Sequence, residues 1–135
     1  MARIKVLTTL FFIYFSASIP TLGRADTKQS ATTLKAKLDQ VPTDVTSRTK
    51  LAEIYFKQKN YKAVVSTLDP YSADLKVVGL DLLAKAYLQQ GDSFNELRIL
   101  KRIVAQNPEE ADLHIRLGKA YIKQNKVEEA VQSVR

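Results

Sequence analysis

The stretch that decides the fold is Leu117-Gly118-Lys119-Ala120-Tyr121, and the chain contains two earlier versions of it, Leu83-Ala84-Lys85-Ala86-Tyr87 and Leu51-Ala52-Glu53-Ile54-Tyr55. Each version has a large apolar residue, a small one directly after it, and a tyrosine three positions further on. At helical spacing these side chains share one face. The tyrosines are 32 and then 34 residues apart. A pattern that returns at a nearly constant spacing of this size predicts a repeat protein.

A turn signal and a second apolar run follow each tyrosine. After Tyr87 the signal is Gly91-Asp92, and Gly91 stands where the end of a helix needs a left-handed residue. Asn107-Pro108 predicts the start of the helix that carries Tyr121, with Asn107 as its cap and Pro108 as its first residue. Each unit is therefore predicted to be two amphipathic helices joined by a short turn. The second helices are expected to carry Val64, Val65 and Leu68, then Leu97, Leu100 and Ile103, then Val127, Ala130 and Val131.

These units resemble tetratricopeptide repeats, which are helix-turn-helix units of about 34 residues. The match is best from Asn107-Pro108 to Arg135, where Leu117-Gly118, Tyr121 and Ala130 occupy the positions that the family's pattern requires. Two departures stand out, because Glu96 replaces a small residue in the middle unit and Arg48 replaces a large apolar residue in the first. The resemblance implies an all-α fold, an α-solenoid of antiparallel helix pairs. Its units are expected at about 45–76, 77–110 and 111–135, the last of them incomplete, within a repeat region of 43–135.

Residues 1–25 are predicted to be a signal peptide. Arg3 and Lys5 precede a mostly apolar run over Val6–Ile19, and Gly23-Arg24-Ala25 offers small residues at the positions that a cut after Ala25 needs. The alternatives are a buried helix and an uncleaved membrane anchor, for which the run is short, because a crossing helix needs about 20 apolar residues. We therefore expect an exported protein, periplasmic or secreted, that has no membrane span once the signal is cleaved.

Residues 26–42 are expected to form a linker and a capping helix. Ala31, Leu34, Leu38 and Val41 form a helical stripe that ends at Pro42, which predicts a helix over 29–41. This helix would be the second helix of a degenerate unit or a cap, and in either case it would cover the front edge of the array, as such arrays require.

The opposite edge carries no such cover. The sequence stops at Arg135, about one turn before the last helix is expected to end, so Val127, Val131 and Val134 would line an exposed edge. Three explanations stay open: the chain is a shortened form of a longer array, another protein covers this edge, or a second copy does so by self-association.

Composition and motifs argue against catalysis. The chain has no cysteine, which excludes disulfides and thiolate metal sites. His114 is the only histidine, and the carboxylate pairs Glu109-Glu110 and Glu128-Glu129 are expected in first turns, where they complement the helix dipole. Because Arg3, Lys5 and Arg24 supply three of the seven net positive charges, the remaining +4 makes a weak case for nucleic acid. We expect no enzyme activity, no metal and no cofactor.

The resemblance implies that a protein or peptide partner lies on the concave surface that the first helices line. The repeat phase predicts nine groove residues in three rows: Phe56, Leu88 and Ile122; Glu53, Lys85 and Lys119; Lys57, Gln89 and Lys123. An apolar row beside four lysines and one glutamate suits a segment with apolar anchors and acidic residues. The alternative is that the lysines only solvate exposed helix faces.

The function expected from the sequence is that of an exported protein–protein interaction scaffold or assembly factor that holds a partner segment in this groove. Two alternatives come from other classes. One is a structural subunit of an envelope complex that docks through the exposed C-terminal edge. The other is an accessory module for an envelope polysaccharide or peptidoglycan enzyme.

Overall fold

The computed structural model describes residues 22–134, with side chains placed for residues 28 and 30–134. Within this range the chain forms helices only, which confirms the predicted all-α class. In chain order they are α1 (Leu22–Gln40), α2 (Val45–Lys57), α3 (Tyr61–Leu68), the short 3-10 helix η1 (Asp69–Tyr71), α4 (Val77–Gln90), α5 (Ser93–Gln106), α6 (Ala111–Lys123) and α7 (Val127–Ser133).

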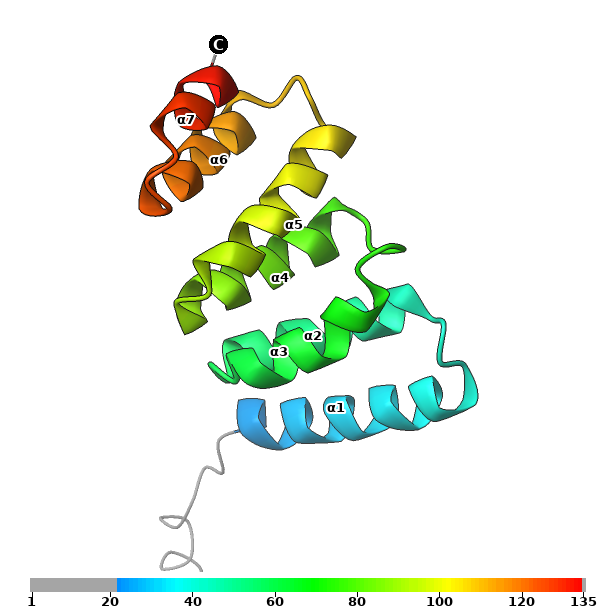
Figure 1. Cartoon of the computed structure of the whole chain (residues 1–135). Helices are drawn as coiled ribbons and strands as arrows, with labels where there is room; N and C mark the ends of the chain where they lie inside the picture. Colours follow the sequence, from blue (N-terminus) through cyan, green and yellow to red (C-terminus); the bar gives the residue numbers. More distant parts are fainter. Residues whose placement is uncertain (1–21, 135) are drawn as a thin grey trace, which may run out of the picture.

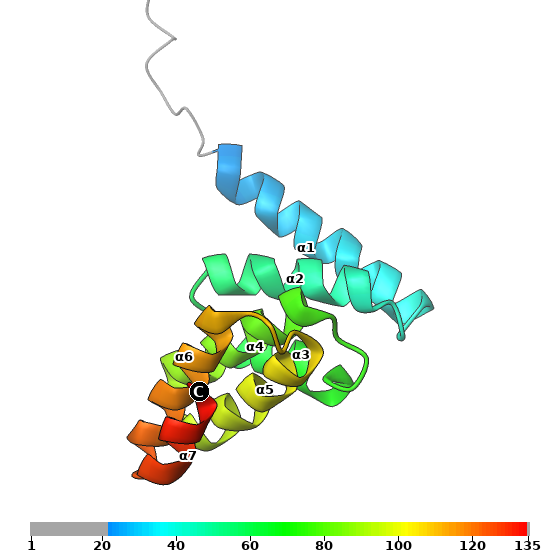
Figure 2. The ribbon, with the colours of Figure 1, turned by 90° about the horizontal axis from the view of Figure 1, so that it is seen from above.

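The helices stack in one direction, from α1 at one end to α7 at the other (Figure 1). Three antiparallel hairpins, α2–α3, α4–α5 and α6–α7, form the units, and each helix contacts its neighbours along the chain. The first helices also contact one another across units, since α2 touches α4. Seen from above, the stack turns gradually from α1 to α7 (Figure 2). This is the predicted α-solenoid of helix pairs.

Short polar signals set the ends of several helices. The side chains of Asp44, Asn60 and Asp92 accept hydrogen bonds from backbone N–H groups in the first turns of α2, α3 and α5. Gly91 ends α4 with a φ of 73°, in the left-handed region that the sequence indicated. These caps keep the turns short, so the two helices of each hairpin lie side by side.

One predicted helix start is wrong. Asn107 does not cap α6, because its backbone N–H donates to the carbonyls of Ile103 and Val104 and thereby closes the end of α5. Residues 108 and 109 form a turn, and α6 begins only at Ala111 with Glu110 as its cap residue. Pro108 therefore belongs to the connection between the units.

The N-terminal helix is longer than the predicted 29–41, because α1 begins at Leu22 and ends at Gln40. It packs on α2, and Leu38 is buried in that contact zone. Lys35 lies 5.7 Å from the ring centre of Tyr55, as Lys101 of α5 lies 5.3 Å from that of Tyr121. Each lysine precedes its tyrosine by 20 positions, so α1 occupies the place that a second helix of a preceding unit would take.

The predicted signal peptide falls largely outside the described residues. Residues 1–21 are not described, and residues 22–25 are the first turn of α1. None of the helices within 22–134 combines the length and the apolar character that a membrane crossing requires.

The core runs through all three hairpins. Its fully buried large side chains are Val64, Leu68, Leu80, Leu83, Ile99, Leu100 and Ile103. Arg48, which replaces a large apolar residue, lies over the ring of Tyr71 at 3.4 Å from its centre and donates to the backbone carbonyl of Pro42. The aliphatic stem and the stacked guanidinium of this arginine thus take the place of an apolar side chain.

Candidate functional site

The candidate site is the face that the first helices α2, α4 and α6 present in common. All nine predicted groove residues lie on these three helices. The apolar row, Phe56, Leu88 and Ile122, comes from their last turns, and its exposure rises toward the C-terminus. Phe56 is half-buried and packs edge-on against Tyr61 with 5.3 Å between ring centres, whereas Leu88 is 41% and Ile122 62% exposed. The apolar surface that a partner can cover is therefore concentrated on α4 and α6.

Two of the four groove lysines are already engaged within the chain. Lys85 forms an ion pair of 2.7 Å with Asp81, one turn before it on α4, and Lys123 reaches Glu96 of α5 at 3.5 Å. Lys57 and Lys119 have no carboxylate within ion-pair distance among the described residues. Free positive charge in the groove is therefore carried by Lys119 on α6 and Lys57 on α2.

Asp81 is a groove residue that the sequence reasoning missed. Its carboxylate also accepts a hydrogen bond of 2.6 Å from Arg116, so it links α4 to α6 across two units. Burial alone would raise the pKa of Asp81, but the hydrogen bonds and charges of Lys85 and Arg116 outweigh it and lower this pKa below its ordinary value. The spacing of Asp81 and Lys85, four positions on a helix, was the signal that could have identified the first of these pairs.

The remaining predicted groove residues are polar and form no ion pair among the described side chains. Glu53 on α2 is half-buried, and Gln89 at the end of α4 is exposed. Ile115, which the sequence reasoning did not select, lies one turn before Lys119 on α6 and is 45% exposed. The predicted groove residues thus change along the stack, from the half-buried Glu53 and Phe56 on α2 to the exposed Lys119 and Ile122 on α6.

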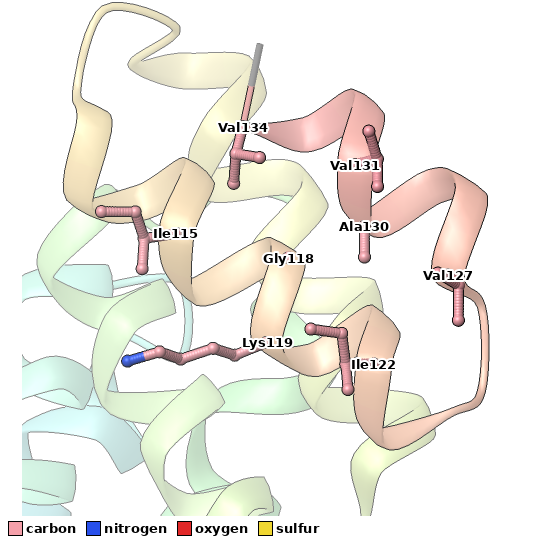
Figure 3. A pocket seen from close by; sticks show the side chains of 8 residues that line it. All are labelled: Ile115, Gly118, Lys119, Ile122, Val127, Ala130, Val131 and Val134. Atoms are coloured by element: carbon pink, nitrogen blue, oxygen red, sulfur yellow. The ribbon is translucent and has the colours of Figure 1, made fainter.

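A hollow of about 270 Å³ opens between α6 and α7 at the C-terminal edge. Figure 3 shows Ile115, Lys119 and Ile122 on its α6 side, and Val127, Val131 and Val134 on the side of α7 and its cap. The floor is formed where α7 comes close to Gly118: a Cβ at this position would lie 3.1 Å from Ser133 Oγ and 3.3 Å from a methyl group of Val134. Lys119 and Ile122 thus belong both to the groove and to this hollow.

His114 holds the last hairpin together. Its Nδ1 lies 2.9 Å from the carbonyl oxygen of Ser133, and its Nε2 lies 2.7 Å from that of Pro108. Both ring nitrogens therefore face backbone carbonyl oxygens, one before α6 and one at the end of α7, and a neutral ring, which has one N–H, donates to one of them. Within the described part of the chain, no group of three His, Asp or Glu side chains is arranged to hold a metal ion.

Comparisons with known proteins agree with this architecture. Residues 97–134, which cover most of α5 and all of α6 and α7, match the sequence model of the tetratricopeptide repeat family. Among curated proteins, none matches the sequence.

Solved structures with the same fold include a crystal structure of MamA, with a TM-score of 0.70 at 19% identity over 90% of this chain and 72% of that one. A structure of MamA from AMB-1 has a TM-score of 0.71 at 18% identity, over 83% of this chain and 62% of that one. A structure of MamA from Desulfovibrio magneticus RS-1 has a TM-score of 0.63 at 19% identity, over 83% of this chain and 64% of that one. The chain spans less than two thirds of the length of the latter two. At these identities the likeness shows the fold alone.

Proposed function

We propose that this chain is a protein–protein interaction scaffold that binds a partner segment along the face of α2, α4 and α6. The observation that carries the proposal is the exposure of Leu88 and Ile122, two large apolar side chains on successive first helices, next to free lysines. Exposed apolar surface rimmed by polar residues is typical of interaction sites. The tetratricopeptide match of residues 97–134 supports the proposal, because repeats of this kind build extended binding surfaces.

The groove chemistry defines the partner segment. Because Lys85 and Lys123 already have carboxylate partners, acidic groups of the segment would pair with Lys119 and, further along the stack, with Lys57. Such exposed pairs contribute about 1 kcal/mol or less each. Burying a whole leucine or isoleucine side chain contributes roughly 1.5–3 kcal/mol. Burying only the exposed parts of Leu88 and Ile122 contributes about half of that for each residue. The apolar contacts therefore supply most of the affinity, and the lysines orient the segment.

The test compares substitutions inside and outside the groove. A partner recovered by pull-down from the native host is measured by surface binding kinetics against Leu88→Ala, Ile122→Ala and the control Phe94→Ala. Phe94 is an exposed apolar residue of α5 that is not part of the groove. We expect each groove variant to speed dissociation about tenfold, which corresponds to 1.4 kcal/mol, and Phe94→Ala to bind as the wild type does. A groove double variant that still binds with wild-type affinity would refute the proposal.

We further propose that the protein is exported, with a cut after Ala25. The basis is the sequence of residues 1–25: a basic start, an apolar run and small residues before the cut. A cut there would make Asp26 the first residue of the mature chain. Mass spectrometry of protein from the native host should find a mature chain that begins at Asp26. A chain that retains Met1 in the cytoplasmic fraction would contradict the export proposal.

A further inference from the structure

The turns inside the three hairpins form one edge of the molecule, which we call the turn edge. They lie on the same side of the stack, and α1 begins on that side too (Figure 1). Neighbouring turns touch, since Gln124 Nε2 donates a hydrogen bond of 2.7 Å to the backbone carbonyl of Ser93. The connections between units, residues 69–76 and 107–110, lie at the other ends of the hairpins and form the opposite edge.

Positive charge is concentrated on the turn edge of the first hairpin. Lys57, Lys59 and Lys62 are exposed there, and none has a carboxylate within ion-pair distance among the described residues. Glu53, half-buried on α2, is the one acidic residue in the sequence of α2, α3 and the turn that joins them. Lysines with so little counter-charge create a positive potential that attracts anions.

The opposite edge is acidic. Its exposed carboxylates form no ion pair among the described side chains, and they are Asp74, Glu109, Glu110 and, at the start of α6, Asp112. Lys76 is the one cationic residue in the sequence of these connections. An anionic surface would therefore attract the turn edge and repel the opposite edge, which orients the molecule on it.

One of these lysines has an unfavourable backbone conformation. Lys59 has a φ of 58°, and it occupies the place that Gly91, with a φ of 73°, has 32 positions later in the next unit. The left-handed region costs free energy for a residue with a Cβ and is readily adopted by glycine. A lysine that stands here in spite of this cost supports a use for its charge.

Phe94 adds apolar surface to the turn edge. At 69% it is the most exposed large apolar side chain that the structure describes, and it occupies in α5 the place that Lys62 has in α3, 32 positions earlier. Its hairpin packs between the two others, so its exposure does not depend on an end of the stack. An aromatic ring beside lysines is typical of a surface that lies on a bilayer, where the ring enters the headgroup region.

The turn of the last hairpin is close to neutral. Lys126 is exposed there, but so are Glu128 and Glu129 in the first turn of α7, and Lys123 is paired with Glu96. The attractive part of the turn edge therefore belongs to the first two hairpins.

We propose that the turn edge docks on an anionic phospholipid membrane, with Phe94 in the headgroup region and Lys59 and Lys62 near the lipid phosphates. The cations that face outward here are lysines, which respond to the field of a charged surface rather than grip a single phosphate as a bidentate arginine does. The chain also enters the described fold at this edge, because α1 begins there, and the sequence before it contains the apolar run Val6–Ile19. The proposal does not depend on what the groove binds.

Co-sedimentation with lipid vesicles tests the proposal on the protein as recovered from its native host, with no groove partner present. Vesicles of phosphatidylcholine and phosphatidylglycerol in equal parts should bind it, more weakly as salt is added, and vesicles of phosphatidylcholine alone measure the binding that does not depend on charge. Each lysine near an anionic surface contributes about fivefold in affinity. Reversal of both charges, Lys59→Glu with Lys62→Glu, should therefore weaken binding by at least about tenfold, and Phe94→Ala should weaken it by about tenfold.

Matched controls lie at the opposite edge and in the groove. Lys76→Glu makes the same change of charge, and Val78→Ala shortens an exposed apolar side chain, both at the start of α4; these variants and the groove variant Leu88→Ala should bind vesicles as the wild type does. Lys59→Gly should raise the melting temperature, because it relieves the left-handed φ, and still weaken vesicle binding. A purely structural role of this lysine would not produce both effects.

Circular dichroism checks that each variant keeps its helices. The proposal is overturned if the wild-type protein binds anionic vesicles no more tightly than neutral ones, or if Lys76→Glu weakens binding as much as Lys62→Glu does. It is also overturned if Phe94→Ala binds as the wild type does while soluble polyglutamate displaces the vesicles, because the edge would then be a site for an acidic macromolecule. None of these results bears on the groove, whose binding is measured without lipid.

Discussion

Replacement of Tyr87 by alanine tests the register of the repeats. Tyr87 is only 5% exposed and belongs to the core of the middle unit. Its hydroxyl is hydrogen-bonded with Asp69 and Arg98, which also pair with each other at 2.6 Å. Removing a buried aromatic side chain of this size costs about 3–5 kcal/mol. At roughly 4 °C per kcal/mol for a domain of this length, Tyr87→Ala should lower the melting temperature by about 12–20 °C.

Tyr87→Phe separates the ring from the hydroxyl. It keeps the buried ring and leaves Asp69 paired with Arg98, so it should cost only about 1 kcal/mol at neutral pH. Burial and the hydrogen bond with Asp69 raise the pKa of Tyr87 to about 12, from about 10 in the unfolded chain. The folded state therefore holds this proton more tightly, and the resulting stability is present below pH 10 and is lost as the pH rises toward 12.

The alkaline loss amounts to about 2–3 kcal/mol, since each pKa unit corresponds to about 1.4 kcal/mol. Chemical unfolding at several pH values between 8 and about 12 should show the wild type losing stability relative to Tyr87→Phe, which lacks this group and controls for all other titrations. Two results would refute the reasoning: an unchanged melting temperature of Tyr87→Ala, which would mean that the register is wrong, or parallel stability curves of the wild type and Tyr87→Phe.

Two further substitutions test the contacts between helices. Gly118→Val should cost about 1–3 kcal/mol by overpacking, because even a Cβ would lie 3.1 Å from Ser133 Oγ; hydrogen exchange should show faster exchange in α7, and slow exchange there would contradict the close approach. Asp81→Asn should cost about 1–2 kcal/mol by removing the ion pairs with Lys85 and Arg116. These pairs lower the pKa of Asp81, so the stability that they give the folded chain is present above about pH 4 and is lost as the pH falls. The free energy of unfolding of Asp81→Asn should therefore depend less on acid pH than that of the wild type. An equal dependence would rule the pairs out.

The register of the repeats could be predicted because it depends on local spacing. Leu83, Ala84 and Tyr87 define it, and all three are buried. Their spacing places them on one face of a helix, and that face packs on the core. The start of α6 could not be predicted in the same way. Asparagine is a common helix-capping residue, but whether Asn107 ends α5 or begins α6 depends on how the two units are connected. Here its backbone N–H bonds to carbonyls at the end of α5.

The helices that carry the nine predicted groove residues could be predicted, but the ion-pair partners of these residues could not. Repeat phase places the nine residues on the three first helices, where the structure has them; that they form one binding surface stays a prediction. It does not identify partners that come from another unit, such as Arg116 for Asp81, 35 positions apart, or Glu96 for Lys123, 27 positions apart. These contacts depend on the angle at which neighbouring units pack, which no local pattern encodes.

Glu96 shows how a departure from the repeat pattern changes the groove. It occupies a position where a small residue is expected, and its side chain is almost completely buried, so its carboxylate needs a partner inside the fold. Lys123 of the next unit is that partner, at 3.5 Å. A lysine that the sequence assigns to ligand binding is therefore used to compensate a buried charge, as Lys85 compensates Asp81. A count of the lysines along the groove thus overstates the number that a ligand can pair with. Asp81 and Glu96 engage two of the four, which leaves Lys57 and Lys119 free among the described residues.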